Sequence, residues 1–265
     1  MLSLNNVSKV FDAGTVNEKY AVKNLSATFA KGDFVTIIGA NGAGKSSILN
    51  LIAGVYFPEE GKITLDGSDI TRIPEFRRAD RISRVFQDPM VGTASDMWLE
   101  ENLALAYRRG KRRGLRWGIT EKEREFFIEK LRPLGLGLEK RLSVKTGLLS
   151  GGQRQALTLL MASFNNPSLL LLDEHTAALD PGTAGKVLEL TEQIVAENEL
   201  TTLMVTHNMK DAIAYGNRLI MLSAGNILLD ISGEEKQHLT VAELMQRFAD
   251  LSGEELDNDE LLLTS

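Results

Sequence analysis

The sequence predicts an α/β fold, a largely parallel sheet with helical crossovers into which a helical lobe is inserted. Strand-like and helix-like segments alternate on both sides of a glycine-rich stretch at residues 39–46, which favours parallel strands. Between residues 95 and 168 the apolar spacing is helical and strand signals almost vanish, which indicates the inserted lobe. With 265 residues the chain can bury a sizeable core, as one large domain or as two lobes sharing a core.

The individual elements follow from the period of the apolar residues. Strands are expected where short runs are apolar or β-branched, at 2–7, 25–29, 34–38, 62–66, 82–86, 169–172, 201–205, 219–222 and 227–231. Helices are expected where apolar residues recur with a helical period, at 46–53, 74–79, 98–107, 121–134, 153–164, 182–196, 208–215 and 241–251. We therefore expect one domain over 1–265, with an α/β core at 1–94 and 166–251, a helical lobe at 95–165 and an acidic tail at 252–265.

Composition excludes several classes of protein. The 36 acidic and 30 basic side chains give a net charge of -6, which argues against a general nucleic-acid binder. The absence of cysteine excludes disulfides, thiolate metal sites and cysteine nucleophiles, and permits a reducing cytosol. The start of the chain does not resemble a secretion signal, and the longest apolar run, 169–172, is far shorter than the roughly 18 residues that a membrane span needs. Any membrane role must therefore come through a partner.

The glycine-rich stretch is a phosphate-binding loop by pattern. Residues 39–46 fit G-x-x-x-x-G-K-[ST] between an apolar strand and a helix, a context that disfavours a chance glycine-rich loop. Its glycines let the backbone wrap an anion, Lys45 adds a positive charge, and the Ser46 hydroxyl can bind Mg²⁺. The residues expected to contact the nucleotide are Gly39, Asn41, Gly42, Ala43, Gly44, Lys45, Ser46 and Ser47.

Two acidic residues follow the apolar run 169–172. At the tip of a strand beside the phosphate loop, Asp173 can hold Mg²⁺ directly or through water, and Glu174 can accept a proton from an attacking water. The alternative is a surface acidic pair after a strand.

A second glycine-containing segment, Leu-Ser-Gly-Gly-Gln at 149–153, opens the helix expected at 153–164. Ser150 offers a cap hydroxyl, and Gly151, Gly152 and Gln153 complete a second helix N-terminus suited to anions. With this segment the sequence resembles the ATPase subunits of ABC transporters, whose signature motif it matches in full. The resemblance covers nearly the whole chain and implies a P-loop NTPase (RecA-like) core with an antiparallel β subdomain and an inserted α-helical subdomain.

The resemblance implies further site residues. Gln87 corresponds to the Q-loop residue that reaches Mg²⁺ and the transporter contact surface, and Asp180 lies in the D-loop. His207 corresponds to the switch histidine that touches the γ-phosphate and orients the water, and Phe11 to the adenine-stacking aromatic. From the residues alone, Phe11 is either a purine platform or a strand-end aromatic packed on the sheet. One position departs from the family, because His175 stands where proline is usual, which puts the local turn and D-loop rigidity in doubt.

The resemblance also implies how the two anion sites work together. Two copies of the chain pack head to tail, so that each ATP lies between the phosphate loop of one copy and residues 150–153 of the other. ATP and Mg²⁺ are the expected ligands, with Lys45 and the two helix ends taking the developing charge. Closing and opening of this dimer can move attached membrane subunits.

The basic segment 108–116, with six basic residues around two glycines, has three interpretations. It is a solvated loop, a surface attracted to anionic lipid headgroups, or, third in order, a nucleic-acid contact. The acidic tail is most simply disordered and solubilising.

Three segments, at 14–19, 107–118 and 173–178, resemble small bacterial importer ATPases. These associate with a multi-span permease and an extracytoplasmic solute-binding protein of the amino-acid type, which implies a peripheral position on the cytoplasmic face of the membrane. The expected solute is an amino acid or related small molecule. The alternatives are a soluble ABC ATPase without a permease and a module that uses ATP only as a dimer clamp, although Glu174 and His207 favour turnover.

Overall fold

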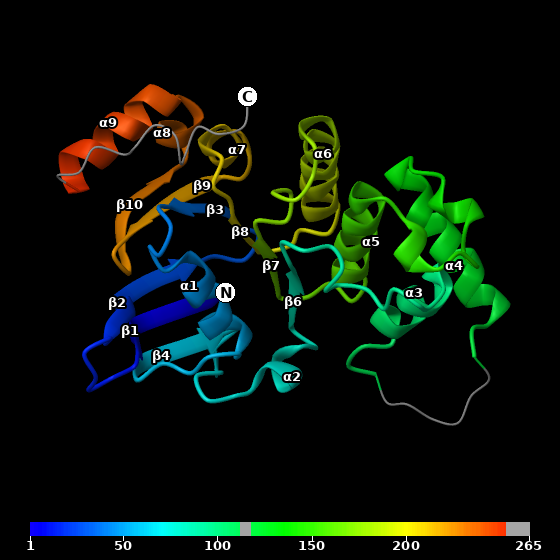
Figure 1. Ribbon diagram of the computed structural model, residues 1–265, viewed down its shortest axis with the longest axis horizontal. Helices are drawn as coiled ribbons and strands as arrows, with labels where there is room; N and C mark the ends of the chain where they lie inside the picture. Colours follow the sequence, from blue (N-terminus) through cyan, green and yellow to red (C-terminus); the bar gives the residue numbers. More distant parts are fainter. Residues whose placement is uncertain (112–117, 253–265) are drawn as a thin grey trace. The chain divides into compact units, whose positions relative to one another are not determined.

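The computed structural model describes residues 1–111 and 118–252 (Figure 1). Its internal contacts divide the chain into two compact units, each considered by itself. The phosphate-loop unit comprises Met1–Arg78 and the described residues from Glu199 onward, and the helical unit comprises Ala79–Asn198. The acidic tail from residue 253 onward and residues 112–117 of the basic segment lie outside the described residues.

One sheet of the phosphate-loop unit is antiparallel. Its strands are β1 (Leu2–Phe11), β2 (Lys19–Phe29), β4 (Glu60–Leu65) and β5 (Ser68–Asp69), in the order β2-β1-β4-β5. The apolar side chains of Leu2, Leu4 and Val7 are buried on β1, which gives the sheet one apolar face. This sheet is the antiparallel β subdomain that the resemblance implied.

The second group of strands in this unit carries the phosphate loop. It contains β3 (Phe34–Gly39), β8 (Thr202–Val205), β9 (Arg218–Ser223) and β10 (Asn226–Ser232), in the order β10-β9-β3-β8. β3 runs parallel to both β8 and β9, and all six of its residues are buried, as expected for a strand covered on both faces. β9 and β10 form an antiparallel pair.

The phosphate-loop unit also contains helices, most of which pack against these strands. They are α1 (Lys45–Ala53), α2 (Glu75–Arg78), α7 (Met209–Ala214), α8 (Glu234–Gln237) and α9 (Val241–Ser252). Figure 1 shows α8 and α9 beside β10, and buried Leu244 and Phe248 of α9 pack into a core that includes Met209 and Leu219. Burying each of these large side chains stabilises the unit by about 2 kcal/mol.

The carboxyl end of α1 is held by a buried arginine. Arg78 donates hydrogen bonds to the carbonyl oxygens of Leu51 (2.9 Å) and Ile52 (2.7 Å), in the last turn of the helix, and to that of Ile73 (2.6 Å). Burial lowers the pKa of Arg78 to about 10, so the guanidinium remains charged at neutral pH and complements the negative end of the helix.

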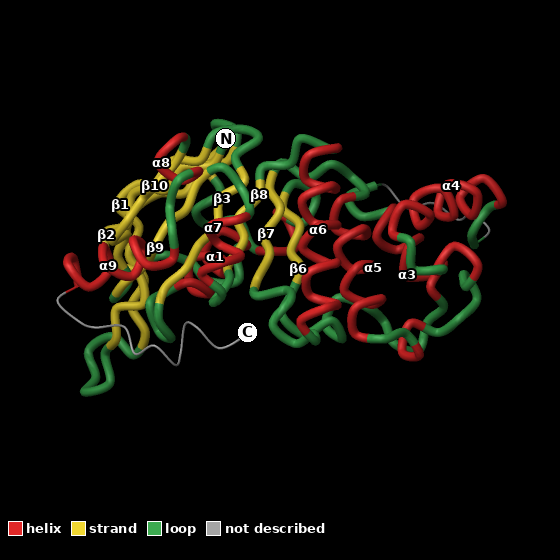
Figure 2. The backbone as a smooth tube through the Cα atoms, turned by 90° about the horizontal axis from the view of Figure 1, so that it is seen from above, coloured by secondary structure: helices red, strands yellow, loops and turns green. Residues whose placement is uncertain are grey.

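The helical unit contains two parallel strands, β6 (Ile82–Val85) and β7 (Leu169–Asp173). Its helices are α3 (Leu99–Tyr107), α4 (Glu121–Leu131), α5 (Gly151–Ser163) and α6 (Pro181–Glu197). In Figure 2, α5 and α6 run side by side. The buried core of this unit includes Leu103, Phe127, Leu157 and Leu160, and the ring of Phe127 stacks on Phe164 with centroids 6.1 Å apart.

The predicted elements are present, with differences at their ends. The helix expected at 121–134 ends at Leu131 and continues as a 3-10 turn, Arg132–Leu134, because Pro133 cannot continue an α-helix. β1 and β2 extend to Phe11 and from Lys19, since the two strands pair along this length. The short elements β5 and α8 were not predicted. The division of the chain at residues 95 and 165 stays a prediction.

Candidate functional site

The phosphate loop joins β3 to α1 and folds around its own lysine. Lys45, at the first position of α1, is buried, and its ammonium group donates to the carbonyl oxygens of Gly39 (2.7 Å) and Ala40 (3.2 Å). These bonds hold the positive charge inside the ring of the loop, whereas Asn41, Gly42 and Ser46 are exposed. The loop therefore presents backbone and hydroxyl groups to solvent above a buried cation.

Two glycines of the loop are required by close contacts as well as by conformation. The φ angles are 151° at Gly39 and 105° at Gly44, a region that L side chains rarely adopt. A Cβ atom on Gly39 would lie 2.4 Å from the Leu222 carbonyl oxygen, and one on Gly44 would lie 2.4 Å from that of Ala21. Strands β9 and β2 thus approach the loop too closely for any side chain at these positions.

The N-terminus of α1 is uncapped. Gly44 occupies the cap position without a side chain, and the first turn contains no acidic residue. The first hydrogen bond along the helix runs from the Ile48 amide to the Gly44 carbonyl (2.9 Å), so the amides before Ile48 point toward the open end of the helix. The first-turn amides and the positive end of the helix dipole together suit a phosphate group.

His207 lies at the same edge of the sheet as the phosphate loop. It follows β8, which pairs in parallel with β3, and the Thr206 amide donates to the Ile37 carbonyl (3.1 Å) just before the loop begins. Burial raises the pKa of the nearby Asp211 carboxyl, while the charges of His207 and Lys210 act in the opposite direction. The structure therefore brings His207 and the phosphate loop together within one unit.

Phe11 and Lys19 lie at the end of the β1–β2 pair. The two residues are cross-strand partners, and the Lys19 ammonium nitrogen lies 3.4 Å from the point that a Cβ on Gly42 would occupy. The half-buried Phe11 ring packs edge-on against Tyr56, with centroids 5.3 Å apart, so the strand-end alternative describes its present contacts. Its stacking on a purine stays a prediction. The sequence did not predict Lys19 as a site residue, because only the strand register places it beside the phosphate loop.

In the helical unit, β6 and β7 bring Gln87 and the acidic pair to one edge. The strands are parallel with Val85 opposite Leu172; Asp173 is the next residue after Leu172, and Gln87 lies two residues after Val85. Gln87 is exposed, and Asp173 and Glu174 are half-buried. The Asp173 carboxylate accepts a hydrogen bond from the Arg84 guanidinium at 2.6 Å, so this carboxylate already binds a cationic group. The surface-pair alternative does not describe Asp173, whose side chain is 14% exposed.

The predicted cap at Ser150 is present. Its hydroxyl accepts from the Gln153 amide (3.2 Å), and the Gln153 side-chain oxygen accepts from the Ser150 amide (3.2 Å), a reciprocal capping box. Because the box begins the helix at Gly151, α5 starts two residues earlier than predicted. Gly152 is buried where α6 passes closely, since a Cβ there would lie 2.1 Å from the Thr183 methyl group.

Asp180 caps the next helix. Its carboxylate accepts a hydrogen bond from the Thr183 amide (3.0 Å) at the start of α6, and hydrogen bonds from Thr183 lower the pKa of this exposed carboxyl. This is a structural contact within the chain. The predicted role of Asp180 at a nucleotide stays a prediction.

The described part of the basic segment is engaged internally. Arg108 pairs with the Glu123 carboxylate at 2.8 Å, Arg109 bonds the Ser83 hydroxyl, and the Lys111 ammonium lies 3.5 Å from the centre of the Tyr107 ring. These contacts favour the interpretation as an ordinary loop for its first residues. The lipid hypothesis then depends on residues 112–117, which lie outside the described residues.

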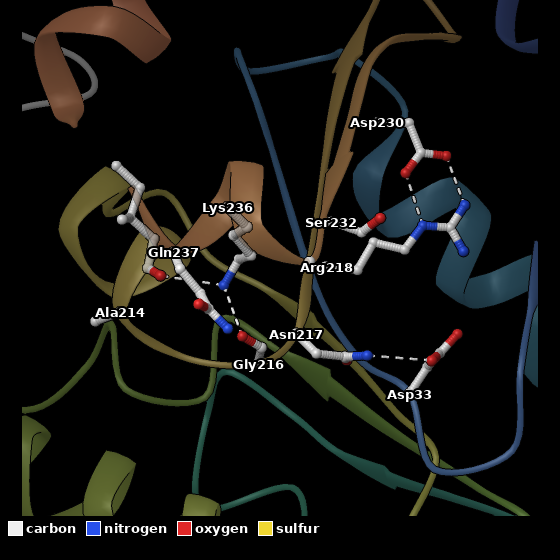
Figure 3. Close-up of a pocket in the computed structure, with 11 residues that line it drawn as sticks. Asp33, Ala214, Gly216, Asn217, Arg218, Asp230, Ser232, Lys236 and Gln237 are labelled. Carbon is white, nitrogen blue, oxygen red and sulfur yellow. Dashed lines mark hydrogen bonds and ion pairs between the residues drawn. The ribbon is translucent and has the colours of Figure 1, made fainter. Parts of the chain in front are cut away.

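A depression of about 990 Å³ lies at the opposite end of β3, and Figure 3 shows its polar lining. Arg218 forms two hydrogen bonds with the Asp230 carboxylate (2.7 and 2.5 Å), and the Asn217 side chain bonds Asp33. The buried Lys236 ammonium donates to three carbonyls at the end of α7, those of Ile213, Tyr215 and Gly216. The polar groups that line this depression thus have hydrogen-bond partners within the chain. Ligands of α/β sheets bind instead at the carboxyl ends of the strands, where the phosphate loop lies.

Comparison with known proteins agrees with this geometry. The family model described as ABC transporter matches residues 22–177. The chain belongs to the ABC transporter family. It is 47% identical over 248 residues to a tyrosine transport ATP-binding protein of Clostridioides difficile, covering 94% of this chain and 98% of that protein. It is 33% identical over 216 residues to a thiamine import ATP-binding protein of Shigella flexneri, covering 82% of this chain and 88% of that protein.

Solved structures confirm the predicted fold class of this ABC ATPase. The dimeric post-hydrolysis structure of the ATP-binding cassette MJ0796, bound to ADP and Pi, matches with a TM-score of 0.74 and 32% identity. The match covers 88% of this chain and 98% of that one. As a member of this family the chain is an ATPase that binds nucleotide. Among residues 1–111 and 118–252, no helix is both long and apolar enough to cross a bilayer.

Proposed function

We propose that this chain is the ATP-hydrolysing subunit of a bacterial importer for an amino acid or a related small solute. The open N-terminus of α1 above a buried lysine supports nucleotide binding. The 47% identity to a protein named for tyrosine transport supports the solute class. The subunit sits on the cytoplasmic face of the membrane and works with separate permease subunits and a solute-binding protein outside the cell.

The phosphate-loop unit holds the nucleotide in this proposal. The β- and γ-phosphates bind the amides of residues 42–47 and the Lys45 ammonium, which turns from its own loop carbonyls to the phosphate oxygens. Lys19 adds a second positive charge beside the loop at Gly42. The adenine stacks on Phe11, at the end of the strand that pairs with Lys19.

Magnesium suits the oxygen donors at the predicted metal positions. The Ser46 hydroxyl, the Gln87 side-chain oxygen and the Asp173 carboxylate are the hard ligands that this ion prefers. Asp173 already accepts one cationic partner, Arg84, which must share or leave the carboxylate when the ion binds. When bound, Mg²⁺ supplies positive charge to the phosphate oxygens.

Hydrolysis transfers the γ-phosphoryl group to water. The Glu174 carboxylate takes a proton from the attacking water. The oxygen of the water forms a bond to the γ-phosphorus, and the bond between this phosphorus and the leaving oxygen of ADP breaks. His207 orients the water and contacts the γ-phosphate, and Lys45 stabilises the charge that develops on the phosphate oxygens.

A second copy of the chain completes the site. The N-terminus of α5 with Ser150, Gly151, Gly152 and Gln153 binds the γ-phosphate held by the phosphate loop of the other copy. The dimeric state of the matched cassette with ADP and Pi supports this arrangement. Asp180, near the start of α6, lies at the same interface.

Exposed apolar side chains near Gln87 suit the permease contact. Met90, Val91 and Trp98 are 54%, 61% and 46% exposed, in the segment that follows Gln87. Exposed apolar side chains of this kind are available for contact with another protein. Recovery of a hydrophobic multi-span subunit with the chain would separate this function from that of a soluble ABC ATPase.

The Glu174→Gln variant tests the proposed chemistry. We expect ATP binding to be retained and steady turnover to fall by about 100-fold or more, because the proton acceptor is lost while the loop is intact. The variant then accumulates as a nucleotide-bound dimer, measured by size-exclusion chromatography with and without Mg²⁺-ATP. Glu192→Gln, on the exposed face of α6, is the matched control and retains full turnover. Undiminished turnover by Glu174→Gln would contradict Glu174 as the base.

A further inference from the structure

The segment between β7 and α6 holds Glu174 in an unusual backbone conformation. Glu174 has a φ angle of 44°, in the left-handed region that non-glycine residues rarely adopt. Two turns follow, from the Ala177 amide to the Glu174 carbonyl (3.0 Å) and from the Leu179 amide to the Thr176 carbonyl (3.1 Å). Such a conformation persists only where the surrounding structure fixes it.

The next residue, His175, is buried and hydrogen-bonded to α6. Its side chain is 2% exposed, and its Nε2 atom lies 3.0 Å from the Thr191 hydroxyl oxygen in α6. That hydroxyl donates its one hydrogen to the Val187 carbonyl at 2.7 Å, so it accepts a hydrogen from His175. The imidazole is therefore the tautomer protonated at Nε2. Burial lowers the pKa of His175 to about 4, so the ring is neutral at the pH of the cell.

The chain from His175 to Thr191 to Val187 ties the residue after Glu174 to the second and third turns of α6. Asp180 ties the other end of the segment to the first turn of the same helix through the Thr183 amide (3.0 Å). The turn that carries Glu174 is thus hydrogen-bonded at both ends to the same helix. A proline at position 175 would restrict φ, but it could not form the side-chain bond to Thr191.

We infer that His175 is a positioning residue for ATP hydrolysis. Its hydrogen bond to Thr191 fixes the left-handed backbone at Glu174 and so orients the carboxylate that accepts the proton of the attacking water. This inference rests on the proposed role of Glu174. It gives His175 a function in turnover rather than in nucleotide affinity, because the nucleotide is bound through the phosphate loop.

The test compares two amides of different reach. In His175→Gln the side-chain nitrogen occupies nearly the position of Nε2 and can donate to Thr191, whereas in His175→Asn it corresponds to Nδ1 and cannot reach the hydroxyl. We expect His175→Asn to lower kcat by about 10- to 100-fold, with the ATP dissociation constant within about twofold of the parent. His175→Gln should restore kcat to within about threefold of the parent.

The Thr191→Val variant tests the other end of the bond. It removes the acceptor while keeping the shape of the side chain, so it should lower kcat as His175→Asn does. Because both variants break the same bond, the double variant should be no slower than either single variant. Equal kcat values for His175→Gln and His175→Asn, or additive losses in the double variant, would overturn the inference.

Two controls separate the possible failures. Thermal unfolding of each variant shows whether a loss of kcat reflects unfolding, and the Gln and Asn variants remain a matched pair if both are somewhat destabilised. If Glu174→Gln loses turnover and His175→Asn does not, only the positioning role is wrong. If Glu174→Gln keeps full turnover, the proposed base itself is wrong, whatever the His175 variants show.

Discussion

Two helices of this chain begin at glycine-containing segments, and their N-termini differ. At α1 the cap position is Gly44, in a left-handed conformation and without a side chain to bond the first-turn amides. At α5 the cap is Ser150, and it and Gln153 bond each other's amides reciprocally. The first helix has no side-chain cap, whereas the second satisfies two amides from its own sequence.

This difference suits different roles for the two helix N-termini in binding an anion. The α1 terminus, which has no side-chain cap and has Lys45 buried beneath it, suits a phosphate bound within one copy of the chain. The α5 terminus is stable by itself and offers its remaining amides and dipole, which suits a surface that meets a nucleotide already bound elsewhere.

The α1 terminus should tolerate no Cβ at Gly44. In Gly44→Ala the methyl group meets the Ala21 carbonyl oxygen at 2.4 Å, in addition to the strain of a φ angle of 105°. We expect the free energy of unfolding to fall by about 2–4 kcal/mol and ATP binding to be lost, measured by denaturant unfolding and nucleotide titration. Gly67→Ala is the control, because Gly67 has a φ angle of 77° with no atom within 4 Å of the added Cβ. Similar losses in both variants would mean that conformation alone, and not the close strand, requires glycine at position 44.

At the α5 terminus, packing against α6 and not backbone conformation should require glycine at position 152. In Gly152→Ala the added methyl group lies 2.1 Å from the Thr183 methyl group of α6, so we expect a loss of about 1–3 kcal/mol in the free energy of unfolding. Thr183→Ser removes the clashing methyl group, and the double variant should recover most of the loss. Gly151→Ala is the matched control, since its Cβ would meet only the Leu179 side chain at 3.3 Å. A double variant as unstable as Gly152→Ala would contradict this account of Gly152.

Lys19 should add a smaller electrostatic contribution to the α1 site. Its ammonium group lies beside Gly42, so Lys19→Gln should weaken ATP binding by about 3- to 10-fold, which is roughly 1 kcal/mol, with a reduced dependence on salt. Lys23→Gln on the same strand is the control, because the Lys23 ammonium lies over the Tyr20 ring at 5.9 Å. Equal effects of the two variants would show only a general loss of positive charge.

Reasoning from sequence succeeded where one short segment contains the whole signal. The phosphate loop and the Ser150 cap are local patterns, and both are present in the structure. Arg84 on Asp173 and Lys19 beside Gly42 could not be predicted, because each contact depends on which strands pair and in which register. The anchor of His175 on Thr191 likewise depends on the packing of α6 against a turn 16 residues earlier. A buried histidine in place of a proline was visible in the sequence, but its partner was not.

The most direct test of the nucleotide shared between two copies is a crosslink between the two helix termini. The chain has no cysteine, so a mixture of Asn41→Cys and Leu148→Cys, both at exposed positions and each in the Glu174→Gln background, reports on this contact alone. With a short bifunctional maleimide we expect crosslinked heterodimers that form with Mg²⁺-ATP and not without nucleotide. The absence of this product at saturating Mg²⁺-ATP, in samples shown to bind ATP, would contradict the account.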